Sequence, residues 1–303
     1  MKPPPFDYHA PTTVTEAVGL LGAGVKVLAG GQSLVPLLNM RLAAPTALVD
    51  ITRIDELRRI EVTAEAVRVG AAVRHRDLER HEDAGAANPL LPLALRHVAH
   101  EVIRNRGTVV GSLAHADPAG ELPAVLAIGD GTVEVARDDG AGGVSTRHVA
   151  AADFFLGPLE ADLRPGELVT HARFPALPPS TGAAFVERAR RHGDYALSGV
   201  AAVVDAAGGR VARARVAAIG VHPTPLVVDV GDLAAGSAPA ELTAPAAWRA
   251  AGERLAERCE PEDDIHASAD YRRHLTQVIA ARALAEAAGR AGEPAPDVSR
   301  SPA

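Results

Sequence analysis

The sequence predicts an α+β protein in which two small mixed lobes precede a third region with its own antiparallel sheet. Helical and strand-like apolar spacings alternate over residues 1–176, and the chain contains no internal repeat. Three long strand-like runs followed by two helical runs occupy residues 181–288. At 303 residues, the chain is too long for one small domain and can bury two or three cores.

The first lobe is predicted over residues 1–55. It opens with Thr13-Val14-Thr15-Glu16, which has the form of a capping box and therefore marks the start of a helix. The apolar spacing then predicts, in order, a helix, a strand, a helix and a strand over residues 17–21, 25–28, 34–38 and 47–51.

The second lobe is predicted over residues 56–176. Alternating valines predict a strand near residues 62–69, and a charged helix is expected over 74–81. Leucines, valine and isoleucine at helical spacing predict one helix over 89–103, and strands should follow at 132–136 and 168–174. Residues 175–180 hold three prolines and have the composition of a linker.

The third region is predicted over residues 181–288 as a three-stranded antiparallel sheet backed by two helices. The expected strands are residues 183–188, 198–205 and 211–221, and the expected helices are residues 246–259 and 269–283. Ser268 is a suitable N-cap for the last helix. Residues 289–303 are rich in Gly, Pro, Ser and charge, which predicts a disordered tail.

Composition excludes several classes of function. The net charge is -7 and the pI is about 5.9, so no basic field exists to hold nucleic acid or an anionic membrane. Cys259 is the single cysteine, so the chain alone cannot build a four-cysteine iron–sulfur cluster or an internal disulfide. The twelve histidines show no metal-ligand spacing, and no metal is expected. The N-terminus lacks a signal-peptide core and no run is long enough for a membrane span, which favours the cytoplasm.

Two short glycine-containing segments carry the functional signal. Ala29-Gly30-Gly31-Gln32-Ser33 joins a predicted strand to a helix, and Thr108-Val109-Val110-Gly111-Ser112 follows a helical run and leads to His115-Ala116-Asp117-Pro118-Ala119-Gly120-Glu121. Exposed backbone amides at such junctions bind phosphate. Two of them could hold a diphosphate between two lobes, while the later polar side chains meet ribityl or ribose hydroxyls. The sequence therefore predicts a dinucleotide cofactor.

Each of these signals also has an ordinary structural interpretation. Glycine pairs commonly mark plain turns, and Asp117-Pro118 is equally typical of a turn or a helix start. Tyr195, after a Gly-Asp turn, could be a packing residue. The G-x-G-x-x-G signature is absent at the first segment, which argues against a Rossmann domain.

Six stretches in this chain resemble the medium, flavin-binding subunit of molybdenum hydroxylases of the carbon monoxide dehydrogenase and xanthine dehydrogenase type. They occur in the family's order between residue 6 and about residue 285. They are Phe6-Asp7-Tyr8, Leu28-Ala29-Gly30-Gly31-Gln32-Ser33-Leu34-Val35-Pro36, Arg104-Asn105-Arg106-Gly107-Thr108, Ser112-Leu113-Ala114-His115-Ala116-Asp117-Pro118, Arg190-Arg191-His192-Gly193-Asp194-Tyr195-Ala196 and Asp270-Tyr271-Arg272-Arg273.

The resemblance implies a two-lobed FAD-binding region of the vanillyl-alcohol-oxidase (PCMH) type and a C-terminal α+β domain that closes over the flavin. The implied cofactor contacts are Ala29, Gly30, Gly31, Gln32, Ser33 and Leu34 as one wall, Thr108, Gly111 and Ser112 as the other, with His115, Asp117 and Glu121 following on the same side. Tyr195 is the implied contact of the isoalloxazine ring. No catalytic acid or base is required, because the flavin itself carries the electrons.

Two positions depart from the family's pattern. Val110 precedes Gly111 where relatives have two glycines, and a valine at positive φ would be strained by roughly 1–3 kcal/mol. Glu187 stands where some relatives carry a lysine near the flavin. The first departure predicts weakened FAD binding if that backbone is left-handed, and the second predicts an altered field at the ring.

The resemblance further implies an oxidoreductase subunit that passes electrons from two 2Fe-2S clusters in a small partner subunit through FAD to an external acceptor. Substrate oxidation would occur at the molybdopterin cofactor of a large partner subunit, and the implied assembly is a dimer of heterotrimers. Two alternatives stay open: a degenerate scaffold that no longer holds FAD, favoured by Val110, and a stand-alone flavin oxidase. The partner would select the substrate, so carbon monoxide, purines, aldehydes and N-heterocycles are all compatible with this chain.

Overall fold

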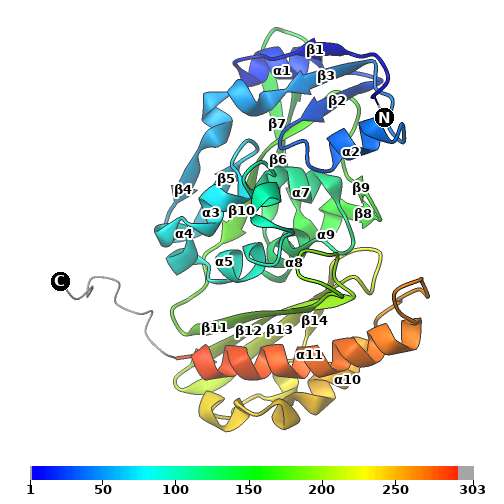
Figure 1. The fold of residues 1–303 in the computed structure, drawn as a ribbon. Coiled ribbons are helices and arrows are strands. Elements are labelled where there is room, and N and C mark those ends of the chain that lie inside the picture. Colours follow the sequence, from blue (N-terminus) through cyan, green and yellow to red (C-terminus); the bar gives the residue numbers. More distant parts are fainter. Residues whose placement is uncertain (1, 293–303) are drawn as a thin grey trace, which may run out of the picture.

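The computed structural model describes residues 2–292, and its strands form three main sheets placed one after another along the molecule (Figure 1). Each sheet contains strands from a different part of the chain, in the same order as in the sequence. A small hairpin of β8 (Phe155–Gly157) and β9 (Glu160–Ala161) lies beside them. The α+β class is therefore confirmed.

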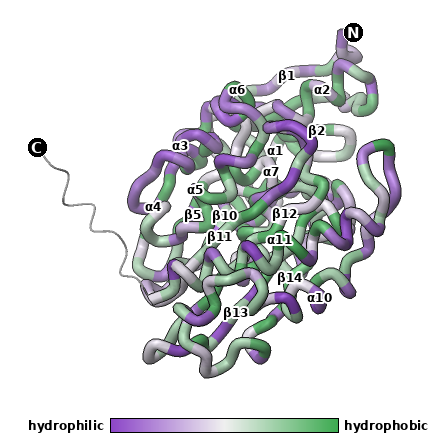
Figure 2. The backbone as a smooth tube through the Cα atoms, turned by 60° about the horizontal axis from the view of Figure 1, so that its bottom comes forward, coloured by the Kyte–Doolittle hydropathy of each residue, from purple (hydrophilic) through white to green (hydrophobic). Residues whose placement is uncertain are grey.

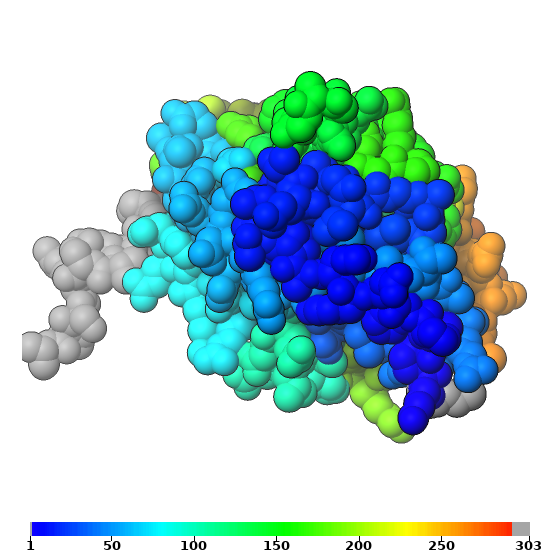
Figure 3. Space-filling view, turned by 90° about the horizontal axis from the view of Figure 1, so that it is seen from above, coloured from blue at the N-terminus to red at the C-terminus, as the bar shows by residue number. Residues whose placement is uncertain are grey.

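The first sheet has three parallel strands in the order β1-β3-β2. Its elements are β1 (Asp7–His9), α1 (Val14–Leu20), β2 (Val25–Leu28), α2 (Leu34–Asn39) and β3 (Ala47–Asp50). The capping residue is confirmed, since the Glu16 amide donates to Thr13 Oγ1 at 3.1 Å. The short, largely exposed β1 carries no apolar alternation and was not predicted. Seen from above, this N-terminal part covers the middle of one face (Figure 3).

The second sheet is antiparallel, with the strand order β4-β5-β10-β6-β7. Its strands are β4 (Ile60–Val62), β5 (Ala66–Gly70), β6 (Thr132–Asp138), β7 (Val144–Ala150) and β10 (Glu167–Pro175). The associated helical segments are η1 (Ile51–Arg53), η2 (Asp55–Arg58), α3 (His75–Glu79), α4 (Glu82–Ala87), α5 (Leu90–Leu95), α6 (Glu101–Arg104), α7 (Val109–His115), α8 (Glu121–Ile128) and α9 (Ala151–Phe154).

The single helix predicted over residues 89–103 is wrong, because the chain forms α5 and α6 with a break between them. Ala99 has φ 45°, which a right-handed helix cannot continue. The Arg104 guanidinium donates to the carbonyls of Val98 and Ala99 at 3.1 and 3.3 Å and so satisfies them at the break. Arg104 also pairs with Glu79 at 2.9 Å, which makes it a structural residue.

The third sheet is antiparallel as predicted, but it has four strands instead of three. The strands run in the order β11 (Thr181–Arg188), β12 (Ser198–Ala207), β13 (Arg210–Ile219) and β14 (Leu226–Asp229). Only four residues long and preceded by two prolines, β14 gives too short an alternation to be read as a strand. One face packs on α5 and α8, and the other is covered by α11 (Figure 1).

The remaining helical elements lie at the C-terminal end. They are η3 (Gly231–Leu233), η4 (Pro239–Leu242), η5 (Pro245–Trp248), α10 (Arg249–Glu257) and α11 (Ala269–Arg290). The Ser268 cap is confirmed, because its Oγ accepts from the Tyr271 amide at 3.2 Å. The predicted tail starts too early, since Gly289 and Arg290 are helical and Arg290 Nη1 donates to the Ala183 carbonyl at 2.7 Å. The rest of that tail, residues 293–303, lies outside the described residues.

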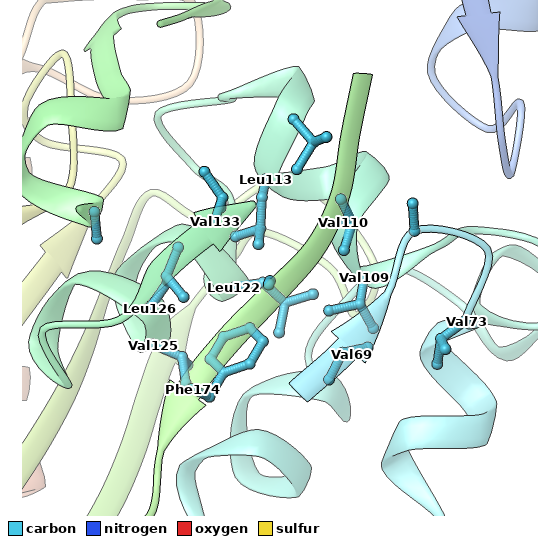
Figure 4. Close-up of a cluster of buried hydrophobic side chains, with 14 of the residues drawn as sticks. Val69, Val73, Val109, Val110, Leu113, Leu122, Val125, Leu126, Val133 and Phe174 are labelled. Atoms are coloured by element: carbon cyan, nitrogen blue, oxygen red, sulfur yellow. The ribbon is translucent and has the colours of Figure 1, made fainter. Parts of the chain in front are cut away.

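Two apolar cores hold the fold together. One joins the first two sheets and the helices between them, and it includes the α7 and α8 side chains shown in Figure 4. The other lies between the third sheet and α10 and α11. In Figure 2, hydrophilic and hydrophobic segments alternate along the chain. The short helix α6 buries none of its four residues. Within residues 2–292, no helix has both the length and the apolar character needed to cross a membrane.

Candidate functional site

The two glycine segments meet in the structure. We call residues 29–34 the first loop and residues 106–112 the second loop. A Cβ on Gly30 would lie 2.5 Å from the Arg106 carbonyl oxygen and 2.6 Å from the Gly107 Cα. The backbones therefore approach to a distance that only glycine permits at position 30. Residues nearly eighty positions apart thus form one continuous surface.

The amides of the first loop are free to bind a ligand. From Gly30 to Leu34, no backbone carbonyl or side chain among the described residues accepts a hydrogen bond from the main-chain N–H groups. Gly31 has φ 72°, a left-handed conformation that glycine adopts without strain. The residues from Gly30 to Leu34 are partly buried or exposed, so their free N–H groups are open to solvent or to a ligand. Consecutive free backbone N–H groups of this kind can bind an anion.

The other predicted residues of the first loop line the same turn. Gln32 is partly buried, and its side-chain amide donates to the Gly30 carbonyl at 3.2 Å. Ser33 is exposed at the start of α2 and makes no capping bond, so its hydroxyl is available as a donor. Ala29 also lies beside the second loop, because its Cβ is 3.9 Å from a Cβ placed on Gly111. The first loop therefore presents amides and one hydroxyl.

The second loop begins the short helix α7. Thr108 is buried, and its Oγ1 accepts from the Gly111 amide at 3.2 Å, which leaves no space for a Cβ on Gly111. Residues 73–75 support the loop from behind, because the His75 amide donates to the Gly107 carbonyl at 3.0 Å and the Val109 amide to the Val73 carbonyl at 3.1 Å. The second loop is therefore held by Gly30 of the first loop on one side and by residues 73–75 on the other.

His75 is a functional candidate that no pattern in the sequence indicated. Its side chain is 3% exposed, and its Nε2 lies 2.9 Å from the Ser112 Oγ. Burial lowers the pKa of His75 to about 4, against a weaker opposing effect of the Thr108 backbone. No local pattern could have revealed this contact, because it joins residues 37 positions apart.

Val110 does not have the strained backbone that the family pattern suggested. It lies in α7 with negative φ, is 2% exposed and packs among the side chains shown in Figure 4. We therefore expect Val110→Gly to destabilise the chain by about 2–4 kcal/mol through lost apolar burial and helix propensity. It should leave the affinity for FAD unchanged. Thermal unfolding and a FAD titration check both parts, and a gain in FAD affinity would contradict this account.

A second group of predicted residues lies between α8 and the third sheet. Asp117, Glu121 and Tyr195 are close enough for the two carboxylates to raise the pKa of the Tyr195 phenol, after the larger effect of desolvation by the neighbouring protein atoms. Asp117 Oδ1 accepts from the Ala119 amide at 2.9 Å, which makes Asp117-Pro118 a turn. The Gly220 amide donates to the Pro118 carbonyl at 2.8 Å and ties this turn to the third sheet.

Glu121 and Glu187 are carboxyl groups with strongly raised pKa values. Burial raises the pKa of Glu121 to about 7, and Asp117 adds to the shift. Burial and the charge of Glu121 raise the pKa of Glu187 to about 8. Glu187 Oε2 is buried without a hydrogen-bond partner among the described residues. Near neutral pH both groups therefore hold a proton for much of the time.

Tyr195 and His115 have different surroundings. Tyr195 is 71% exposed after the turn at Gly193, where φ is 86°, so its ring is open to a planar ligand. His115 ends α7 and is partly buried. No interaction described for residues 2–292 joins these two side chains to each other or to the first loop. The structure thus brings the two loops together. It places Asp117, Glu121 and Tyr195 together as a second, separate group.

The described part of the chain has no group of three or more His, Cys, Asp or Glu side chains placed to hold a metal ion. Cys259 is buried beside α10, its Sγ lies 3.3 Å from the Leu255 carbonyl, and burial raises the pKa of its thiol to about 11. Its burial and raised pKa make this thiol unreactive near neutral pH.

Comparison with known proteins finds matches over nearly the whole chain. The family described as FAD binding domain in molybdopterin dehydrogenase matches residues 4–177, and the CO dehydrogenase flavoprotein C-terminal domain matches residues 183–287. The chain is 38% identical over 296 residues to the 6-hydroxypseudooxynicotine dehydrogenase complex subunit alpha of Paenarthrobacter nicotinovorans, covering 96% of this chain and 97% of that protein. It is 37% identical over 288 residues to the carbon monoxide dehydrogenase medium chain of Hydrogenophaga pseudoflava, covering 94% and 97%.

Solved structures agree with these matches. A chain of carbon monoxide dehydrogenase from Hydrogenophaga pseudoflava is similar with a TM-score of 0.87 and 36% identity, covering 96% of this chain and 100% of that one. A chain of quinoline 2-oxidoreductase from Pseudomonas putida 86 is similar with a TM-score of 0.86 and 37% identity, covering 95% and 99%.

Proposed function

Because the chain belongs to the family of FAD-binding medium subunits of molybdenum hydroxylases, we propose that it carries electrons from 2Fe-2S clusters of a partner subunit through FAD to an external acceptor. One observation in this chain supports the proposal most directly. The first loop presents five consecutive amides that have no acceptor within residues 2–292, and it is packed against the second loop at Gly30. Such a surface fits a diphosphate, which is the most strongly charged part of FAD.

We assign the cofactor contacts accordingly. Ala29, Gly30, Gly31, Gln32, Ser33 and Leu34 form one wall for the diphosphate, and Thr108, Gly111 and Ser112 form the other. His115, Asp117 and Glu121 face the ribityl or ribose hydroxyls. Tyr195 lies against the isoalloxazine, for which its exposed ring is suited. Bound FAD supplies the electron storage, and this chain needs no catalytic acid or base.

The residues of this chain then bind and orient the cofactor and control its surroundings. The amides of Gly30 to Leu34 neutralise phosphate charge without a basic side chain. The α8 end and the third sheet exclude water around Glu121 and Glu187, which hold protons at their carboxyl oxygens. An uncharged pair leaves the region close to neutral, whereas two ionised carboxylates would make it negative.

The partners and organisation follow from the same family. Several relatives are named as medium subunits or chains, including the nicotine 6-hydroxylase medium subunit of Paenarthrobacter nicotinovorans. We propose a small 2Fe-2S subunit, a large molybdopterin subunit and a dimer of such heterotrimers, working in the cytoplasm. We also propose that each main sheet is the core of one unit, with bounds 1–55, 56–176 and 181–288.

The electron-transfer role is tested with the complex isolated from its natural host through a tag on this chain. We expect FAD to remain with this chain, and iron and molybdenum to separate with the two other chains. In stopped-flow measurements, reduction of the clusters should precede reduction of the flavin. A stoichiometric iron–sulfur cluster in this chain alone would contradict the proposed division of labour.

The same preparation distinguishes the two alternative functions. A degenerate scaffold predicts an assembled complex in which this chain lacks FAD. A stand-alone flavin oxidase predicts substrate turnover by this chain without partners. The normal backbone of Val110 removes the feature that favoured the scaffold.

A further inference from the structure

His75 lies behind the proposed phosphate wall, where its ring contacts the Ser112 side chain and the backbone of Thr108. Nε2 is 2.9 Å from the Ser112 Oγ. Nδ1 is buried and has no hydrogen-bond partner among the described residues. A Cβ on Gly107 would lie 2.8 Å from Nδ1, so the ring is packed against that residue and cannot turn freely. The imidazole is thus held at one position.

The ring's surroundings favour its neutral form, with one N–H and one lone pair. The side chain is 3% exposed, and the charged groups that influence it are the cations Arg74 and Arg104. A third cation at this position would be both desolvated and repelled. The neutral imidazole has two tautomers, which use Ser112 in opposite ways.

The unpaired Nδ1 decides between the two tautomers. With the proton on Nδ1, a buried N–H would lack an acceptor, which is rare in folded proteins. With the proton on Nε2, the unpaired group is a lone pair, which is tolerated better, and the N–H points to the Ser112 Oγ. The Nε2-protonated tautomer is therefore the one that this site favours.

This tautomer determines what Ser112 can offer to a ligand. Its Oγ accepts from His75, and among the described residues it has no other hydrogen-bond partner. Its amide already donates to the Thr108 carbonyl at 3.1 Å. The hydroxyl hydrogen is thus free to point away from His75 and to be donated to a ligand.

We propose that His75 is a positioning residue that donates from Nε2 to the Ser112 Oγ and thereby directs the Ser112 hydroxyl hydrogen to a phosphate oxygen held between the loops. The ligand class is a diphosphate ester, and the inference rests on the proposed function for its identity as FAD. In the opposite tautomer, the Ser112 hydroxyl would donate its hydrogen to Nε2 and would offer a ligand only lone pairs. Lone pairs accept from a sugar hydroxyl but repel a phosphate oxygen.

The first test is made on the FAD-free full chain by 15N NMR of labelled histidine, assigned with His75→Gln. We expect the His75 signals of a neutral ring with the proton on Nε2, unchanged between pH 6 and 8. A ring protonated on Nδ1, or one that becomes charged in this range, would overturn the inference whether or not the chain binds FAD.

The second test uses a matched pair, His75→Gln and His75→Met, which have similar length and differ in the amide donor. FAD dissociation constants are measured by flavin fluorescence after thermal unfolding has shown that both variants fold. We expect Gln to stay within about threefold of the unmodified chain and Met to bind about tenfold or more weakly. Equal weakening by both would mean a packing role only.

The last test combines His75→Met with Ser112→Ala. If His75 acts through Ser112, the double variant binds FAD no more weakly than whichever single variant has the lower FAD affinity. If the fold-losses of FAD affinity in the two single variants multiply in the double variant, the two residues act independently, and the inference is overturned. If the unmodified chain binds no FAD, the proposed function fails, while the NMR result still decides the His75 geometry.

Discussion

Gly30→Ala is expected to weaken FAD binding by at least about 100-fold, equivalent to about 2.7 kcal/mol. The added Cβ would meet the Arg106 carbonyl oxygen at 2.5 Å, the Gly107 Cα at 2.6 Å and the Thr108 amide nitrogen at 2.9 Å. All three atoms belong to backbone, so no side chain can move aside. The loops must separate, and the diphosphate would lose simultaneous contact with both.

Flavin content after purification and a fluorescence titration with FAD measure this effect. Gly22→Ala is the matched control, because a Cβ at position 22 has no atom within 4 Å and its φ is not left-handed. We expect the control to bind FAD as the unmodified chain does. A Gly30→Ala variant that folds and keeps full FAD affinity would show that the loop contact is dispensable.

Glu187→Gln is expected to stabilise the chain at high pH by about 2–4 kcal/mol. Burial and the charge of Glu121 raise the pKa of Glu187 from near 4.5 to about 8. One pKa unit corresponds to about 1.36 kcal/mol, and the full shift is reduced here because the group is partly exposed to solvent. The glutamine keeps the shape of the protonated carboxyl and removes the cost of ionising it.

The pH dependence follows from the sign of this shift. Because the folded chain binds the Glu187 proton more tightly than the unfolded chain, its stabilising effect is complete below about pH 4.5 and is lost as the pH rises through about 8. The variant should therefore equal the unmodified chain at pH 4.5 and exceed it at pH 9 in urea unfolding. Glu262→Gln, at an exposed carboxylate, is the control and should change neither value. Equal stability of Glu187→Gln and the unmodified chain at pH 9 would contradict this account.

Local signals in the sequence predicted the elements that local interactions determine. Thr13 and Ser268 cap helices as expected, because capping needs only neighbouring residues. Long strand-like runs, such as those of β12 and β13, were also found where predicted. The break at Ala99 was missed, since the Arg104 side chain that satisfies its carbonyls gives no periodic signal.

The candidate site was predictable only in part, for a similar reason. The glycines of both loops could be read from the sequence, although their purpose at Gly30, the contact between the loops, needs the tertiary structure. The family pattern suggested strain at Val110, whereas the helical backbone and buried side chain remove it. His75 and the raised pKa of Glu187 depend on burial by distant segments, which spacing along the chain does not encode.

The central claim, that this chain holds FAD between the two loops, is tested most directly by the FAD content of the purified chain. The visible spectrum and the mass of the released cofactor are measured on the chain alone, before and after incubation with FAD. We predict one FAD per chain, with oxidised-flavin bands near roughly 370 and 450 nm. A folded, colourless chain that takes up no added FAD would contradict the claim.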